Sequence, residues 1–285
     1  MSSPSFWSSL RNVDCERVER VSGFRKLSLG TWRDAYDPSV YGWTCVDAEP
    51  IDRFLAVRRE ASGEALTYTH FFTAVLAAYF KAHPEANVLL RFGRPYVRRH
   101  VAALVQVAIP AKGHHDVDLS GVTLRKLEGK DLIEIAQEVR QQAAKIRKGE
   151  DKEFAKAKGA LQAIPFFLMF PFIQLMSVVS YTLNLKLSAL GLAEDPFGTF
   201  MVTNVGSLGI DAGFAPLVPY SRCGFVFTIG KKALRPTVSE QGDVVAREQL
   251  SISATFDHRL YDGFHLAGLV RHVERACSHP EDVLT

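Results

Sequence analysis

Apolar residues recur along the chain at two spacings, which predict an alternation of helices and strands. Four segments carry apolar side chains three and four residues apart and are predicted as helices: 50–59, 67–83, 131–149 and 264–278. Six apolar or alternating segments are predicted as strands: 41–46, 101–110, 118–127, 198–205, 223–230 and 250–256. This mixture shows no internal repeat or linker and favours one α/β domain over residues 1–285.

One stretch departs from this pattern, because residues 160–185 contain no charged side chain. Its length suits a membrane-spanning helix, but Pro165 and Pro171 argue against one unbroken helix. We therefore expect an apolar helical insertion at about 160–192 that packs as a buried hairpin or at an interface. Peripheral contact with a membrane and a lining for an acyl chain are the alternatives.

Charge narrows the classes of partner. The 285-residue chain has a net charge of +3 and no basic patch with interleaved aromatic residues, so we expect no nucleic-acid partner. Basic residues do cluster at Arg91, Arg94, Arg98, Arg99 and His100. We interpret this cluster as a solvated loop or strand edge; the alternative is a docking patch for a phosphorylated ligand such as a coenzyme.

The four cysteines lie at positions 15, 45, 223 and 277, and no two form a CxxC pair. This spacing predicts neither a disulfide framework nor a metal site. Free thiols are typical of a reducing compartment. The first eleven residues also lack the pattern of a secretory signal, so we expect a cytoplasmic protein.

Candidate chemistry is concentrated in residues 257–263, between the last predicted strand and the last predicted helix. A histidine at such a corner, here His258, can act as a general base near neutral pH. Asp262 follows four residues later, where its carboxylate could cap the helix or hold an arginine. From the residues alone, a surface histidine beside a helix-capping aspartate is the favoured interpretation of this segment.

Two motifs resemble those of a known family. The sequence His258-x-x-x-Asp262-Gly263 resembles the signature of chloramphenicol acetyltransferases and of the acyltransferase cores of 2-oxoacid dehydrogenase complexes. Residues 198–206, GTFMVTNVG, are similar to the family's Gly-Thr-Phe-Thr-Ile-Ser-Asn-Leu-Gly strand, and Arg25-Lys26 is similar to its N-terminal Arg-Lys pair. The resemblance covers residues from about 21 to 284.

The resemblance implies a two-layer α/β fold with a mixed sheet packed by helices, assembled as a homotrimer with the active site between subunits. His258 would be the general base that activates an acceptor for attack on acyl-coenzyme A. Thr203, where the family has serine, would stabilise the oxyanion. Asp262, paired with Arg25, would fix the histidine loop. Further assembly of trimers is known in the dehydrogenase cores, and no residue is assigned to coenzyme A binding.

Departures from the family pattern leave three functional hypotheses. The sequence shows no lipoyl-lysine hairpin and no Ala/Pro-rich linker, so we expect no covalent lipoyl group in this chain. The first hypothesis is an acyltransferase that moves an acyl group between coenzyme A and a thiol, hydroxyl or amine, with a small-molecule or lipoyl-like acceptor. The second is a non-catalytic assembly protein. The third is a membrane-associated lipid acyltransferase.

Overall fold

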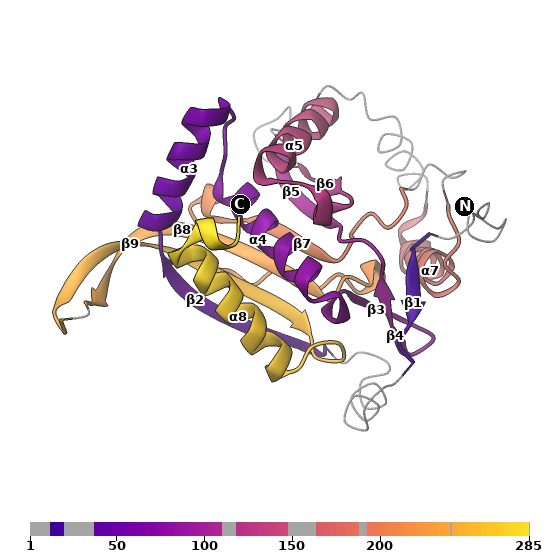
Figure 1. Ribbon diagram of the computed structural model, residues 1–285. Coiled ribbons are helices and arrows are strands. Elements are labelled where there is room, and N and C mark those ends of the chain that lie inside the picture. Colours follow the sequence, from indigo (N-terminus) through magenta and orange to yellow (C-terminus); the bar gives the residue numbers. More distant parts are fainter. Residues whose placement is uncertain are drawn as a thin grey trace, which may run out of the picture.

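A six-stranded mixed sheet forms the centre of the molecule, with helices packed on one of its faces (Figure 1). The computed structural model describes residues 12–19, 37–109, 118–147, 164–187, 193–239 and 241–284. The sheet consists of β2 (Ser39–Asp47), β5 (Ala103–Ile109), β6 (Asp118–Leu124), β7 (Phe200–Asn204), β8 (Phe225–Val238) and β9 (Val244–Asp257). Their order is β2-β9-β8-β7-β5-β6, and β7 is parallel to both of its neighbours.

The four predicted helices are all present. They are α3 (Glu49–Ser62), α4 (Tyr68–Ala82), α5 (Leu132–Arg147) and α8 (Gly263–Ser278). Helix α4 lies over the centre of the sheet, where Phe80 stacks on Phe200 at a ring-centroid distance of 5.5 Å. Because aromatic side chains from helix and sheet fill one continuous core, the helical face of the sheet is fully covered. The mixed α/β fold is thus confirmed.

Strands β8 and β9 are longer than their patterns predict. Beyond a register shift between Ile229 and Lys232, they continue as a two-stranded arm that leaves the body of the molecule (Figure 1). Apolar side chains on the arm are exposed, including Leu234, Val238 and Val244. The arm lacks the alternation of a half-buried strand because neither of its faces packs against the helices, which is why the sequence pattern did not reveal it.

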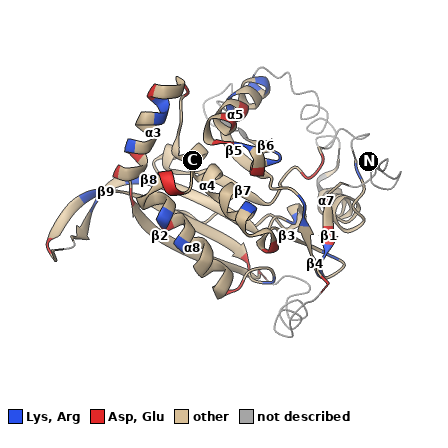
Figure 2. Ribbon diagram, in the orientation of Figure 1, with Lys and Arg blue, Asp and Glu red and all other residues tan. Residues whose placement is uncertain are grey.

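A second, three-stranded sheet carries most of the basic cluster. It is made of β1 (Cys15–Arg17), β4 (Arg94–Arg98) and β3 (Val88–Arg91), of which the sequence pattern predicted none as a regular strand. The interpretation of this cluster as solvated is wrong for Arg98, whose residue is 3% exposed and which pairs with Asp195. Arg99 pairs with Asp14 and Glu16. Basic and acidic residues therefore alternate here rather than form one positive patch (Figure 2).

The apolar insertion contains helix α7 (Phe166–Ser177), which continues into the π-helical turn η3 (Val178–Thr182). Pro171 lies inside α7. Residues 164–187 are therefore largely helical, as predicted, whereas the remainder of the 160–192 segment lies mostly outside the described residues, and its being an insertion stays a prediction. No helix among the described residues is long and apolar enough to cross a membrane.

Candidate active site

His258 lies in the tight turn between β9 and α8, and the backbone on both sides of it is fixed. Its amide donates to the carbonyl of Pro38 at 2.9 Å, and the Asp257 amide donates to Gly224 at 2.9 Å. A Cβ on Gly224 would lie 2.7 Å from the Leu260 side chain, which would then have to shift, so glycine favours this close approach. After the turn, Tyr261 is buried and its hydroxyl donates to Ala86 at 3.1 Å. The half-buried histidine is therefore held on a rigid corner.

The residues that flank His258 form an ion pair. Asp257 is buried, and its carboxylate accepts from Arg259 Nε at 2.9 Å and from Arg259 Nη2 at 2.7 Å. The Arg259 amide also donates to Asp257 at 2.9 Å. A bidentate, largely buried pair of this kind resists separation, because loss of either partner leaves a buried charge. It therefore fixes the direction in which the turn presents His258.

Asp262 begins helix α8 as its N-cap. Its carboxylate accepts from the amides of Phe264 at 3.1 Å and His265 at 3.2 Å, and it also pairs with the His265 ring. The helix-capping interpretation of Asp262 is thus confirmed. Arg25 lies outside the described residues, so its pairing with Asp262 stays a prediction.

A cavity of about 320 Å³ lies beside the same corner. Its polar lining includes Asp37, Ser39, Arg222 and the Asp257–Arg259 pair, and its apolar wall comes largely from residues 216–219 and Leu260. This combination of an apolar wall and a few polar groups suits a small ligand. Sequence reasoning missed the cavity, because the β7–β8 loop that lines it has no apolar period and no chemical motif.

The Cys223 thiol, which lines this cavity, is buried. Burial raises the pKa of Cys223 to about 11. Burial likewise raises the pKa of Cys277 to about 12. Both thiols are therefore protonated at neutral pH and are poor nucleophiles. Among the described residues, no group of three or more His, Cys, Asp or Glu side chains could hold a metal ion, and the four cysteines are free.

Thr203 lies near the end of β7, 8% exposed, at the other end of the sheet. The next residue, Asn204, donates to the Thr69 hydroxyl at 3.3 Å, which ties this strand end to the start of α4. The loop that follows passes so close to β8 that a Cβ on Gly230 would lie 2.1 Å from the Asp211 oxygen. Tight backbone packing thus positions Thr203.

The strand register shows that Thr203 and His258 are far apart within one chain. Thr203 is opposite Thr228 on β8, which is opposite Ser253 on β9. Ser253 precedes His258 by five residues, so the two Cα atoms are separated by two strand spacings and about 17 Å along the strand, or roughly 20 Å in total. One chain therefore brings His258 and Asp262 together, and it does not bring Thr203 to them.

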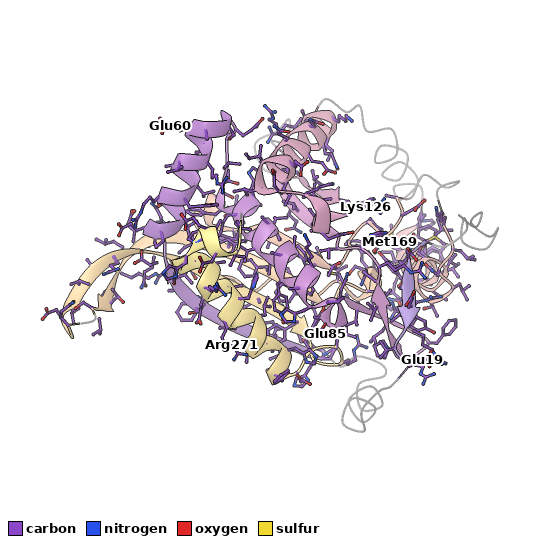
Figure 3. All side chains as sticks on the ribbon, in the orientation of Figure 1. Glu19, Glu60, Glu85, Lys126, Met169 and Arg271 are labelled. Atoms are coloured by element: carbon purple, nitrogen blue, oxygen red, sulfur yellow. The ribbon has the colours of Figure 1, made fainter. Side chains whose placement is uncertain are left out.

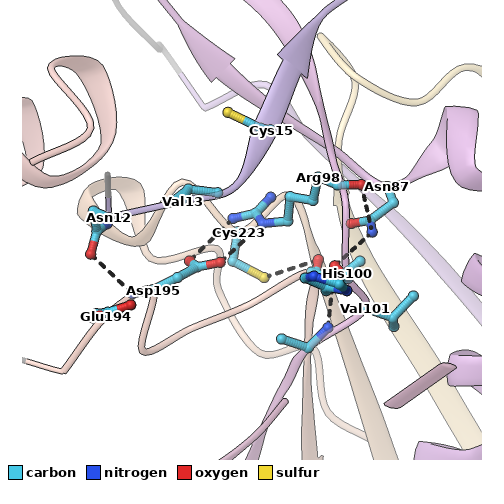
Figure 4. Close-up of polar contacts among 12 residues, drawn as sticks. Asn12, Val13, Cys15, Asn87, Arg98, His100, Val101, Glu194, Asp195 and Cys223 are labelled. Atoms are coloured by element: carbon cyan, nitrogen blue, oxygen red, sulfur yellow. Dashed lines mark hydrogen bonds and ion pairs between the residues drawn. The ribbon is translucent and has the colours of Figure 1, made fainter. Parts of the chain in front are cut away.

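A buried ion pair ties strand β4 to the segment that precedes β7, the strand that carries Thr203. The Arg98 guanidinium faces the Asp195 carboxylate, with a distance of 3.2 Å from Nε to Oδ2 (Figure 4). Burial lowers the pKa of Arg98, but the adjacent Asp195 outweighs this and raises it. Asn12 accepts from the Asp195 amide at 3.1 Å, and the same charges surround the buried Tyr181 that follows α7. No motif in the sequence pairs Arg98 with Asp195.

Comparisons with known proteins place the chain among acyltransferase-like sequences and folds. Residues 181–285 match the family described as 2-oxoacid dehydrogenases acyltransferase (catalytic domain). The predicted resemblance is confirmed. Over 268 residues, the chain is 25% identical to the dihydrolipoyllysine-residue acetyltransferase component of the acetoin cleaving system of Bacillus subtilis. The match covers 91% of this chain and 55% of that protein, so the chain spans about half the length of this acyltransferase relative.

Solved structures of acyltransferases share the fold. The dihydrolipoamide acetyltransferase of Azotobacter vinelandii superposes with a TM-score of 0.61 and 18% identity, over 100% of this chain and 99% of that chain. A chloramphenicol acetyltransferase superposes with a TM-score of 0.51 and 18% identity, over 95% of this chain and all of that chain. The predicted chloramphenicol acetyltransferase-like fold is therefore confirmed.

Proposed function

We propose that this chain is the catalytic part of an acyltransferase that moves an acyl group between coenzyme A and a thiol, hydroxyl or amine acceptor. The observation that carries the proposal is the rigid corner that presents His258. Its neighbours on both sides are held by hydrogen bonds, ion pairs and a helix cap. A scaffold without chemistry has no need of such a presented histidine, which argues against the assembly hypothesis.

In this reaction the His258 imidazole removes the proton from the acceptor as the acceptor attacks the thioester carbonyl. The carbonyl carbon then carries a negatively charged oxygen, to which the Thr203 hydroxyl donates a hydrogen bond. When this intermediate collapses, the carbon–sulfur bond breaks, and the proton held by the imidazole passes to the coenzyme A thiolate. Asp262 and Arg25 are positioning residues, because they hold the loop rather than move the proton.

The separation of Thr203 and His258 supports a trimer as the active species. Because the two lie roughly 20 Å apart in one chain, a single subunit cannot apply both to one carbonyl. A symmetric ring of subunits resolves this, since each His258 can face the Thr203 of a neighbour. In the Azotobacter vinelandii dihydrolipoamide acetyltransferase, a serine, a histidine and an asparagine have been investigated for their role in the catalytic mechanism. That asparagine follows the histidine by four residues, as Asp262 follows His258 here.

The cavity beside the Asp257–Arg259 pair is the candidate acceptor pocket. It fits a small molecule or the end of a lipoyl-like group carried by a partner. A lipid-like acceptor is the second candidate, favoured by exposed apolar side chains on α7, which touches the loop that lines this cavity. A cytoplasmic location completes the proposal, since the cysteines at 15, 45, 223 and 277 form no disulfide.

A coenzyme A release assay tests the proposal. The purified chain is incubated with acetyl-, butyryl- or decanoyl-coenzyme A and with a dithiol, an alcohol or an amine. We expect release with at least one pair, and we expect the oligomer measured by light scattering to be a trimer or a multiple of three. Absence of release in every combination from a folded trimer would leave the non-catalytic assembly protein as the better explanation.

A further inference from the structure

The outward side of α7 and the first residue of η3 carry a row of exposed apolar side chains, interrupted by Gln174. We call Phe167, Leu168, Phe170, Leu175 and Val178 the α7 stripe; all are exposed, with Phe167 at 77% and Phe170 at 73%. At 100° per residue these positions fall within an arc of roughly 160°, which is one side of the helix. Five large exposed apolar side chains on one side of a helix form a candidate interaction surface.

The opposite side of α7 and its continuation are already engaged with the protein. The Arg222 Nε donates to the Ser177 hydroxyl at 3.3 Å, and the Asn184 side chain donates to the Val13 carbonyl at 2.6 Å. Tyr181 is buried beside the Arg98–Asp195 pair. The helix therefore cannot rotate to bury the α7 stripe without losing these contacts.

Strands β3 and β4 lie at the same end of the molecule as α7 (Figure 1), and the hairpin that joins them carries a second exposed apolar side chain. Phe92 forms the tip of the β3–β4 hairpin with a φ of 49° and is 62% exposed. Arg91 precedes it and donates to the Thr182 carbonyl at 3.2 Å, so this tip lies beside the end of η3. In Figure 3 the Met169 label identifies α7, which lies next to β3 and β4.

The side chains around the tip suit a lipid–water boundary. Arg91 stacks on Phe92 and Tyr96, and Arg94 follows on the exposed side of the hairpin. Within the described part of the chain, neither arginine forms an ion pair with a carboxylate. Long guanidinium side chains beside aromatic rings place their charge at the level of lipid phosphates while their stems stay in apolar surroundings.

The area of the α7 stripe decides between a bilayer and a second protein. A helix of 12 residues is about 18 Å long and about 10 Å wide, which gives a footprint on the order of 200 Å². Stable protein interfaces bury about 800 Å² on each partner. The stripe alone is therefore too small for a lasting dimer, whereas shallow insertion of a few large apolar side chains suffices for reversible membrane binding.

We infer that this end of the molecule docks on the surface of a lipid bilayer. The α7 stripe and Phe92 enter the boundary between headgroups and acyl chains, and Arg91 and Arg94 meet the phosphates. The inference goes beyond acyl transfer and does not depend on it. It would bring the chain to a membrane surface without spanning it.

Vesicle flotation of the full chain tests the inference without any activity assay. The vesicles are phosphatidylcholine alone and phosphatidylcholine with a fifth of phosphatidylglycerol. We expect the wild-type chain to float with both kinds of vesicle. The Phe167→Ser/Phe170→Ser variant should bind at least about tenfold more weakly. The matched control, Val57→Ser/Val270→Ser, removes two exposed apolar side chains from α3 and α8 and should bind like wild type.

Folding and self-association are controlled in the same experiment. Phe167→Trp/Phe170→Trp keeps the apolar face and should keep binding, and circular dichroism should show all variants folded. Failure of the folded wild-type chain to bind either vesicle would overturn the inference. Equal binding by the wild type and the serine variant would also overturn it. So would a wild-type oligomer that dissociates only in the serine variant, because a second copy of the chain would then cover the α7 stripe.

Discussion

The two ends of the central sheet hold their candidate catalytic groups in different ways. At the end of β9, His258 sits among charged contacts: the Asp257–Arg259 pair and the Asp262 carboxylate at the start of α8. At the end of β7, the surroundings of Thr203 are held by hydrogen bonds between uncharged groups: Asn204 donates to Thr69, and the Thr67 amide donates to His70 at the start of α4. One sheet can therefore hold a candidate base at one end and a candidate oxyanion donor at the other, independently of each other. We call the surroundings of His258 and of Thr203 the two half-sites.

Replacing the base should have the largest effect. His258→Ala removes the group that accepts the acceptor's proton, so we expect kcat/KM for coenzyme A release to fall by about a hundredfold to ten-thousandfold. The substitution leaves both members of the Asp257–Arg259 pair and the Asp262 cap in place, so we expect the thermal midpoint to change little. A loss below threefold in a folded trimer would mean that the corner does not perform the chemistry.

Removing the hydroxyl at the other end should cost somewhat less. Thr203→Val keeps the shape of the side chain and removes the donor, so we expect kcat to fall by about a hundredfold, with a small change in KM. Thr203→Ser is the matched control and should retain most of the activity. If valine and serine variants are equally active, Thr203 is an ordinary strand residue and the comparison of two half-sites fails.

The half-site around Thr203 should make the free energy of unfolding sensitive to acid, through His70. Burial lowers the pKa of His70 from 6.5 to about 4, although Glu64 opposes this, and its Nδ1 accepts from the Thr67 amide at 3.2 Å. Between pH 6.5 and 4 the unfolded chain binds a proton that the folded chain does not, so the free energy of unfolding falls as pH falls through this window. We expect a loss of about 1–2 kcal/mol from this residue.

Denaturant unfolding at pH 7 and pH 4.5 measures this effect. His70→Gln keeps a side chain that can complete the capping box but does not titrate, so its stability should fall less between the two pH values. An equal loss in wild type and His70→Gln would show that other groups cause the acid sensitivity.

The smallest effect is expected at the cap of α8. Asp262→Asn retains a capping oxygen and should change the free energy of unfolding by less than about 0.5 kcal/mol, whereas Asp262→Ala should cost about 1 kcal/mol. If the Arg25 pair also fixes the histidine loop, both variants lose activity, and the asparagine variant separates this loss from stability. Urea titration and the release assay together provide the two readouts.

The sequence predicted the elements whose structure depends on residues close together in the chain. Helix α4 and strand β9 each show a clear apolar period, and the Asp262 cap follows from a carboxylate before an amphipathic segment. The Arg98–Asp195 pair could not be found in this way, since 97 residues separate its members and only the tertiary fold brings them together. The basic cluster was misread for the same reason.

The separation of Thr203 and His258 within one chain was also beyond sequence patterns, although the family resemblance implies an active site between subunits. Thr203 and His258 each stand in a recognisable motif, but the distance between them depends on the register across β7, β8 and β9. The exposed side of α7 is a similar case, because apolar composition does not reveal which face of a helix remains uncovered.

Subunit mixing tests the central claim most directly. His258→Ala and Thr203→Val subunits, each nearly inactive alone, are unfolded together at equal amounts, refolded, and assayed for coenzyme A release. If one site takes its histidine and its threonine from different subunits, random mixing restores about a quarter of the wild-type activity. Activity no higher than that of the two variants refolded separately would contradict a site shared between subunits.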